Sequence, residues 1–305
     1  MRESVPWEDV FARFIAHIEA EGKADATIRD YHKRVGKFVS SIPRDADEEA
    51  LRETVLTHLA RLRDKAPATY NRTLEDLRAF FSWCVREGYA ASDPTRGIRR
   101  RKDEGRVRAL PEDVVKRLLT LPDRSTWAGA RDYVFILLAL DTGIRSSEAL
   151  RLLPADVDLA RGEILVRAEV AKTRRARVLP ISPPTVKAIR ELLAARPEEW
   201  GDVPVLCSEL GKDLPTASLD ARFARYSRRL GVKVRPYDLR HTFATEFLRR
   251  GGDPLTLRLI LGHATFAMTQ RYVALASSDV KERHREAGVL GRFVEGRRGR
   301  RIRRI

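Results

Sequence analysis

The sequence predicts a mainly α-helical protein of two domains, the second of which carries a small β-hairpin. At 305 residues the chain is long enough for two hydrophobic cores of ordinary size. Apolar residues recur at three- and four-residue spacing along most of the chain, which is the period of a helix with one buried face. A basic segment that lacks both the helical and the strand period, residues 96–109, separates two such regions and predicts a linker.

The first domain, residues 1–95, is expected to consist of four helices. The first helix has one apolar stripe, formed by Val10, Phe11, Phe14, Ile15 and Ile18. Three more segments repeat this spacing. Because the connections between them are short, the helices are expected to pack on one another as a four-helix domain. The predicted helices are 7–20, 25–40, 47–63 and 67–87.

Positive charge is concentrated in two segments of a chain whose net charge is +16. Residues 96–108 hold seven Lys or Arg against two acids, and residues 292–305 hold seven Arg against one Glu. Such segments favour a polyanionic partner and salt-dependent contacts with its phosphates. A basic segment that is only solvated is the alternative. The linker residues expected to contact phosphates are Arg99, Arg100, Arg101 and Lys102, and residues 291–305 are expected to form a basic tail.

The second domain is expected to span residues 110–290 and to be rich in helix. It begins where Pro111 and the two acids after it favour the start of a helix. Strands are scarce: 163–167 and 177–181 are short β-compatible runs on either side of a turn, and 203–207 is a candidate third strand. The predicted helices are 111–121, 126–141, 146–153, 183–195, 215–230, 238–250, 254–261 and 265–276.

Composition argues against several classes of protein. The longest apolar run, residues 134–140, is far shorter than the ~20 residues of a membrane-spanning helix, and no apolar signal segment precedes Trp7. A cytoplasmic protein without membrane contact is therefore expected. Cys84 and Cys207 lie in apolar surroundings that indicate buried thiols. The six histidines include no pair with metal-ligand spacing, so neither a metal nor a cofactor is expected.

Three short motifs of the second domain contain residue types that can transfer a phosphoryl group. Residues 142–145 read Thr-Gly-Ile-Arg, residues 239–242 read Leu-Arg-His-Thr, and residues 261–263 read Leu-Gly-His, with Tyr272 nine residues later. Two arginines can neutralise the non-bridging oxygens of one phosphodiester while a tyrosine hydroxyl attacks the phosphorus. Positioning and charge, rather than a metal ion, would then drive the reaction.

These motifs and their order resemble the tyrosine recombinase family, which includes phage integrases and Xer-type recombinases. The resemblance covers residues 110–280 and implies a helical core-binding (SAM-like) domain followed by the fold of the DNA breaking–rejoining enzymes. It also implies a site-specific recombinase that cuts and rejoins DNA strands through a 3′-phosphotyrosine, with neither metal nor ATP. The family's catalytic positions fall on Arg145, Lys172, Arg240, His263 and Tyr272.

The resemblance implies a role for each of these positions. Arg145 and Arg240 bind the scissile phosphate, and His263 donates a hydrogen bond to it. Tyr272 is the nucleophile. Lys172, in the turn of the hairpin, is the general acid that protonates the leaving 5′ oxygen.

Other residues near these positions support the site or depart from the family pattern. Tyr237 stands where the family usually has a histidine, and its reference pKa of about 10 makes a phenol a poor base near neutral pH. His241 points about 100° away from Arg240 around the helix, so a structural role is expected. Glu148 resembles an acid that orients the site, although stabilisation of a helix N-terminus explains it equally well. The arginines of the hairpin turn that are expected to contact the DNA backbone are Arg174, Arg175 and Arg177.

The implied partner is a double-stranded DNA recombination site at the nucleoid. A monomer or weak oligomer would bind it and assemble into a homotetramer in the synaptic complex. Two other interpretations stay open: a type IB topoisomerase, which relaxes DNA with a similar site, and a DNA-binding accessory protein with a decayed site. The target sequence is not predicted, because base readout depends on side-chain geometry in the grooves and on DNA shape.

Overall fold

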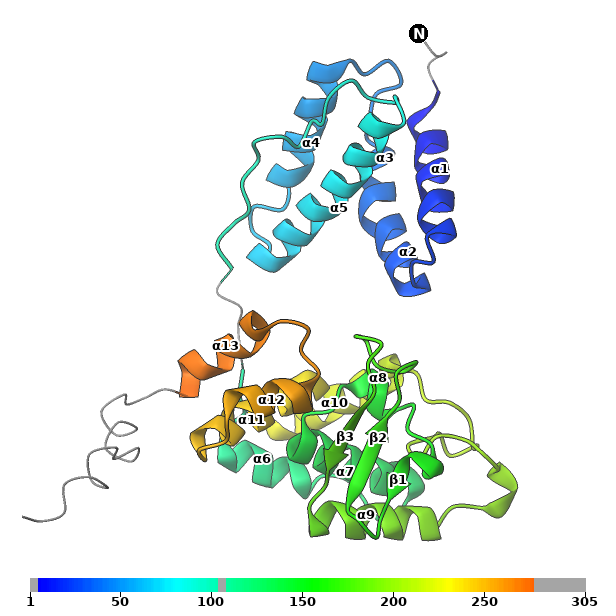
Figure 1. Cartoon of the computed structure of the whole chain (residues 1–305), viewed down its shortest axis with the longest axis vertical. Coiled ribbons are helices and arrows are strands. Elements are labelled where there is room, and N and C mark those ends of the chain that lie inside the picture. The colour runs from blue at the N-terminus through cyan, green and yellow to red at the C-terminus, as the bar shows by residue number, and fades with distance from the viewer. Residues whose placement is uncertain (1–4, 104–107, 277–305) are drawn as a thin grey trace, which may run out of the picture. The chain divides into compact units, whose positions relative to one another are not determined.

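The computed structural model describes residues 5–103 and 108–276 of the chain (Figure 1). The chain divides into two compact units, residues 1–105 and 106–305, each with its own hydrophobic core. The described residues are mostly helical and include a small three-stranded sheet, so the predicted fold class is confirmed. The division falls inside the segment that the sequence predicts as a linker.

The first unit is built around aromatic side chains. Phe14 packs edge to face against Phe80 and Trp83, with ring centroids 5.3 and 5.5 Å apart, a geometry that adds to the gain from burial. The second predicted helix contains a π-helical turn, where Gly36 leaves room for the ring of Phe11. The helices are α1 Trp7–Ala20, α2 Asp25–Tyr31, η1 His32–Gly36, α3 Lys37–Val39, α4 Glu48–Ala60 and α5 Pro67–Arg86.

The first part of the basic segment packs on this unit. The side-chain amide of Asn71, on α5, donates to the carbonyl of Arg101 and accepts from its amide, both at 2.8 Å. The guanidinium of Arg101 lies 3.9 Å from the ring centroid of Tyr70 and also donates to two main-chain carbonyls after α4. Arg100 pairs with Glu75 at 3.0 Å. Specific contacts therefore hold Ile98, Arg100 and Arg101 against α5 and Arg96 against Arg52 of α4.

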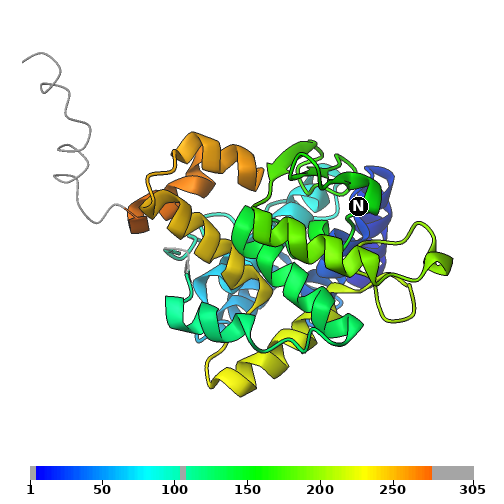
Figure 2. The same cartoon turned by 90° about the horizontal axis from the view of Figure 1, so that it is seen from below.

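The second unit is organised around the buried helix α7, which packs against α9 and α11 (Figure 2). The last three helices of this unit, α11, α12 and α13, also contact one another. Two short 3₁₀ turns, η2 Pro154–Asp156 and η3 Glu198–Trp200, join larger elements. The helices are α6 Glu112–Leu119, α7 Trp127–Thr142, α8 Ser146–Ala149, α9 Pro183–Ala194, α10 Thr216–Leu230, α11 Pro236–Arg249, α12 Pro254–Leu261 and α13 Phe266–Ala276.

The sheet consists of β1 Val157–Asp158, β2 Glu163–Val166 and β3 Arg177–Pro180, antiparallel in the order β1-β2-β3. The predicted hairpin is confirmed by the pairing of β2 with β3. The third strand predicted at 203–207 is wrong: this segment is irregular, although its apolar side chains are buried. Burial alone produced the strand-like pattern there, whereas β1 is too short to show a period.

The helix predicted at 146–153 is also too long, because α8 ends at Ala149. Leu153 has an extended backbone with ψ 157°, the conformation that the following Pro154 favours. The two cysteines are free and buried, as predicted. Within the described residues, no helix has the length and hydropathy needed to cross a membrane.

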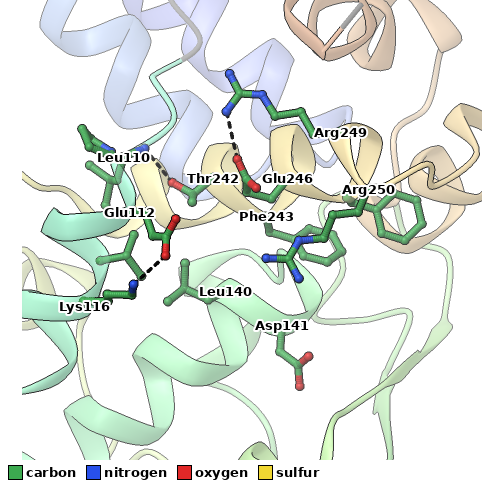
Figure 3. Close-up of a pocket in the computed structure, with 13 residues that line it drawn as sticks. Leu110, Glu112, Lys116, Leu140, Asp141, Thr242, Phe243, Glu246, Arg249 and Arg250 are labelled. Atoms are coloured by element: carbon green, nitrogen blue, oxygen red, sulfur yellow. Dashed lines mark hydrogen bonds and ion pairs between the residues drawn. The ribbon is translucent and has the colours of Figure 1, made fainter. Parts of the chain in front are cut away.

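A hollow of about 770 Å³ lies between α6, the end of α7 and α11 (Figure 3). Thr242 of α11 accepts a 2.8 Å hydrogen bond from the amide of Leu110 at one side of it, and Glu112 pairs with Lys116 nearby. None of the sequence-predicted site residues lines this hollow. The candidate active site is formed by another face of α11 together with residues of α8, β3, α12 and α13.

Candidate active site

Arg145 occupies the cap position before α8, where a sharp turn follows α7. The turn depends on Gly143, which has φ 63° and no room for a side chain: a Cβ there would lie 2.5 Å from the ring of Phe243. The Arg145 side chain is 14% exposed and donates to the carbonyl of Gly262 at 3.2 Å. The glycine turn therefore directs this guanidinium toward the end of α12.

Arg240 is buried on α11, with 1% of its surface exposed. Pro236 stands in the first turn of this helix, so the helix begins two residues earlier than predicted. The guanidinium donates to the carbonyl of Gly143 at 2.6 Å and to that of Leu261 at 2.9 Å. Burial, and then the charge of Arg145, lowers the pKa of Arg240 to about 10, so the group is still charged at neutral pH.

The C-terminal end of α12 is bound by three arginines. Arg177, Arg240 and Arg145 donate to the successive carbonyls of residues 260, 261 and 262. Carbonyls at a helix C-terminus lack intrahelical partners and carry the negative end of the helix dipole. The helix end therefore offsets part of the repulsion among three guanidinium groups that lie close together.

Glu148 supplies the counter-charge for two of these arginines. It is fully buried, and its carboxylate accepts from Arg177 at 2.6 Å and from Arg145 at 2.9 Å. Burial by itself raises the pKa of Glu148, but the pairs with Arg177 and Arg145 outweigh it and the pKa is lowered. Arg177, expected at the hairpin turn as a DNA contact, instead has a side chain only 10% exposed and engaged with Glu148. No local pattern in the sequence indicated this pairing, which joins residues 29 positions apart.

His263 follows the left-handed Gly262 at the end of α12 and is 7% exposed. Its Nε2 lies 3.1 Å from a terminal nitrogen of Arg240, and its Nδ1 lies 2.9 Å from Oγ1 of Thr269. A guanidinium can only donate, so Nε2 accepts and the ring proton sits on Nδ1, which donates to Thr269. Burial, followed by the charges of Arg240 and Arg145, lowers the pKa of His263 to about 3, and the imidazole is neutral.

Tyr272 lies on α13 and is 3% exposed. Its ring packs with Leu248, Leu257 and Leu261 in a small apolar cluster between α11, α12 and α13. The ring is nearly parallel to that of His263, with an interplanar angle of 12° and centroids 6.2 Å apart. Burial, and then Tyr237, raises the pKa of Tyr272 to about 12. The phenol is therefore protonated at neutral pH.

The hydroxyl of Tyr272 is 2.9 Å from Nδ1 of His241, a contact that the sequence interpretation missed. His241 is half-buried on α11, one residue after Arg240. The ring of Tyr237 lies against it edge to face, with centroids 4.5 Å apart, and is 52% exposed. Positions 237, 241, 244 and 248 lie on one helical face, and this spacing is the feature of the sequence that could have predicted the position of His241. A helix can present two adjacent residues to two different parts of a site.

Other predicted site residues lie outside this buried cluster. Lys172, Arg174 and Arg175 are exposed in the loop between β2 and β3, and Arg174 has the unusual φ of 51°. Of the linker residues, Arg99, Arg100 and Lys102 are exposed, whereas Arg101 is held against α5. The basic tail, residues 291–305, and residues 277–290 of the predicted catalytic domain lie outside the described residues.

The arrangement suits a tetrahedral anion next to a phenol. Three guanidinium groups lie near one carboxylate, Glu148, which pairs with Arg145 and Arg177. The buried Nε of Arg240 has no hydrogen-bond partner among the described residues. Such excess donors and charge in a partly desolvated site favour an anionic ligand. In the part of the chain that the structure describes, no cluster of three or more His, Cys, Asp or Glu could hold a metal ion.

Comparison with known proteins agrees with this chemistry. The model of the phage integrase family matches residues 108–279. Tyrosine recombinase XerA of Pyrococcus furiosus is 30% identical over 300 residues, which cover 97% of this chain and 100% of the relative. Tyrosine recombinase XerC of Alcanivorax borkumensis is 34% identical over 218 residues, covering 69% of this chain and 70% of the relative.

Solved structures share the fold. The Tn1549 transposon integrase in complex with a circular intermediate DNA superposes with a TM-score of 0.73 at 17% identity, covering 95% of this chain and 100% of that one. A lambda integrase dimer bound to a COC′ core site gives a TM-score of 0.69 at 17% identity, covering 87% of this chain and 75% of that one. At this level of identity the likeness shows the fold alone.

Fold, motifs and relatives together define a tyrosine site-specific recombinase, an enzyme of DNA strand transfer. Within this class, the chain belongs to the phage integrase family, whose model matches more than half of its length.

Proposed function

We propose that this recombinase cuts a DNA strand by attack of the Tyr272 hydroxyl on a phosphodiester, which forms a 3′-phosphotyrosine and frees a 5′ hydroxyl. A 5′ hydroxyl of a second strand then attacks the phosphotyrosine and releases Tyr272. The supporting observation is the joint burial of Tyr272, His263 and Arg240 in one cluster, with Arg145 bound to the same end of α12. Each phosphodiester lost is replaced by a covalent phosphotyrosine, so rejoining needs no ATP.

Arg145 and Arg240 are proposed to bind the non-bridging oxygens of the scissile phosphate. Both guanidinium groups are held by main-chain carbonyls rather than by carboxylates alone, so a phosphate can take over some of their donors. The unpartnered buried Nε of Arg240 is one such donor. Charge-assisted hydrogen bonds of this kind stabilise the charge that develops in the transition state.

His263 and Lys172 are proposed to complete the site once DNA is bound. The negative charge of a phosphate would raise the pKa of His263 from about 3 and allow Nε2 to donate rather than accept. Lys172 is proposed to protonate the leaving 5′ oxygen. It lies in the exposed β2–β3 loop, so this role requires DNA to lie against that loop.

The proposed substrate is a double-stranded recombination site, bound in the cytoplasm at the nucleoid. Relatives of the same fold have been solved in complex with DNA, among them the Tn1549 integrase and the lambda integrase dimer. The basic segment of residues 96–108 and the hairpin arginines Arg174 and Arg175 would contact phosphates. Four protomers would assemble two sites into a synapse, from monomers or weak oligomers that exist without DNA.

Covalent capture of DNA tests this proposal. Full-length protein is incubated, with divalent metals chelated, with a supercoiled plasmid that carries the DNA flanking its own gene, and adducts are resolved on a denaturing gel. We expect an adduct with the wild type and none with Tyr272→Phe, which removes only the attacking oxygen.

Tyr237→Phe is the matched control, since it removes the second phenol near the site. It should keep the adduct. An adduct that persists in Tyr272→Phe and disappears in Tyr237→Phe would assign the nucleophile to Tyr237. A protein that binds the plasmid and never forms an adduct would refute the proposed chemistry.

A further inference from the structure

We propose that His241 is the general base that takes the proton from Tyr272 during cleavage and returns it during rejoining. This inference rests on the proposed function of Tyr272 and assigns a catalytic role to a residue for which the sequence suggested only a structural one. It begins from the 2.9 Å contact between the Tyr272 hydroxyl and Nδ1 of His241, which joins residues 31 positions apart on α13 and α11.

The direction of this hydrogen bond depends on the charge states of its partners and on the tautomer of His241. The phenol of Tyr272 is protonated, since its pKa is raised to about 12, and the imidazole of His241 is neutral, since burial lowers its pKa below the ordinary 6.5. A neutral imidazole carries its proton on one ring nitrogen and accepts at the other, and we assign the proton of His241 to Nε2, so that Nδ1 accepts from the phenol. Nδ1 of His241 is therefore placed to receive the proton that must leave before Tyr272 attacks.

The site needs such a group because its phenol is a weak nucleophile. At a pKa of about 12, only a very small fraction of Tyr272 is phenolate at neutral pH. Tyr237 stands where the family usually has a histidine, so that position offers no imidazole to take the proton. His241 lies between the two tyrosines. The centroid of its ring is 4.5 Å from that of Tyr237 and 5.5 Å from that of Tyr272.

The step conserves atoms and charge. The O–H bond of Tyr272 breaks as its oxygen bonds to phosphorus, and the proton passes to Nδ1 of His241. The bond from phosphorus to the 5′ oxygen breaks, and that oxygen takes a proton from Lys172, the proposed acid. In rejoining, the attacking 5′ hydroxyl gives its proton back to Lys172, and the departing Tyr272 oxygen recovers its own from His241.

The charges around His241 fit a base that is neutral at rest. On its own helix Asp238 raises its pKa and Arg240 lowers it, but burial has the largest effect and lowers it. From the other elements, Tyr272 of α13 contacts its ring, and the neutral His263 at the end of α12 is near enough for their charges to interact. On its own helix, the ring of Tyr237 packs against it edge to face. The carboxylate of Asp238 and the charge of a bound phosphate would stabilise the imidazolium that forms.

The deciding variant is His241→Asn, because the asparagine side-chain oxygen can occupy the place of Nδ1 and accept from Tyr272 without taking its proton. Adduct formation on the plasmid described above is timed for wild type and variant between about pH 7 and pH 9. We expect the variant to be slower by roughly 10²–10⁴-fold at neutral pH, the usual contribution of a general base. If His241 only positions Tyr272, His241→Asn will keep the wild-type rate.

The pH profile gives a second, independent readout. Wild-type cleavage should be flat from about pH 7 to pH 9, because His241 is already neutral there. The rate of His241→Asn should rise about tenfold per pH unit, because it then depends on the fraction of Tyr272 present as phenolate. Free imidazole should restore cleavage to His241→Gly. A pH-independent rate for His241→Asn, together with no rescue of His241→Gly by imidazole, would overturn the proposal.

A measurement without DNA separates this proposal from that of the overall function. Nitrogen-15 spectra of the histidines in the full-length chain report which ring nitrogen carries the proton. At neutral pH we expect Nδ1 of His241 to be unprotonated and its signal to shift in Tyr272→Phe. A proton on Nδ1 would exclude the base role even if the wild type cuts DNA, and the expected tautomer would uphold the acceptor geometry even if no adduct forms.

Discussion

The imidazole of His263 makes the stability of the second unit sensitive to acid. Its pKa is about 3 in the folded chain, against an ordinary value of about 6.5. Between these values the unfolded chain binds a proton that the folded chain does not, so stability falls as the pH falls from about 6.5 toward 3. We expect the free energy of unfolding of His263→Gln to fall less steeply, by up to about 1.4 kcal/mol per pH unit. Urea unfolding at a series of pH values measures it, and parallel curves would contradict a buried neutral imidazole.

The carboxylate of Glu148 is expected to be required for the stability of the same unit. Glu148→Gln would leave the buried guanidinium groups of Arg145 and Arg177 without their counter-charge. Removing one partner of a buried ion pair typically costs about 3–5 kcal/mol. Glu112→Gln is the matched control, because Glu112 and Lys116 form an exposed pair that should contribute little. Chemical denaturation compares the two, and equal losses would show that the buried network contributes no more than a surface pair.

The turn between α7 and α8 shows how one helix end places the side chain of Arg145. Gly143 and Gly231 both end helices in the left-handed region, with φ 63° and 69°. A Cβ on Gly231 meets nothing within 4 Å, whereas one on Gly143 would collide with the rings and methyl groups of Phe243 and Leu261. Substitution of Gly231 therefore tests backbone strain alone, whereas substitution of Gly143 adds a steric clash to the same strain.

Alanine at these two positions is expected to give unequal effects. Gly231→Ala should cost about 1 kcal/mol, the usual strain of a left-handed alanine. Gly143→Ala should cost clearly more and should also slow DNA cleavage, because the Gly143 carbonyl accepts from Arg240. Thermal unfolding and the covalent-capture assay measure the two effects. Equal losses of stability would mean that Phe243 of α11 and Leu261 of α12 move away from the new Cβ without a loss of stability.

The two units carry separate cores, and the boundary between them decides where the chain can be divided. Through Arg101 the basic segment contributes contacts to Tyr70 and Asn71 of the first unit. We expect fragment 1–103 to unfold at a higher temperature than fragment 1–95, which lacks these contacts. Circular dichroism on heating measures the difference. In 1–103, Arg100→Ala should change little, because Arg100 and Glu75 are 60% and 41% exposed, whereas Arg101→Ala should lower the midpoint toward that of 1–95.

The sequence by itself determined the helices, the hairpin and the identity of most of the candidate site. Apolar spacing is a local property, so α1, α5, α7 and α10 could be read from it almost residue by residue. Arg145, Arg240, His263 and Tyr272 could be proposed because each lies in a short motif whose order along the chain resembles a known family. Their roles remain predictions that the capture assay tests.

Only the tertiary structure decided which side chains meet. The contact of Tyr272 with His241 spans 31 positions, and Arg177 reaches Glu148 across 29 and the carbonyl of Ile260 across 83. The edge strand β1 was missed because two residues are too few to show a period. The irregular run 203–207 was predicted as a strand because burial without pairing looks like a strand in sequence. Such contacts depend on how helix faces pack, and no local period encodes that. The sequence therefore indicated the chemical groups, and the packing of α11, α12 and α13 placed His241, the proposed base, beside Tyr272, the proposed nucleophile.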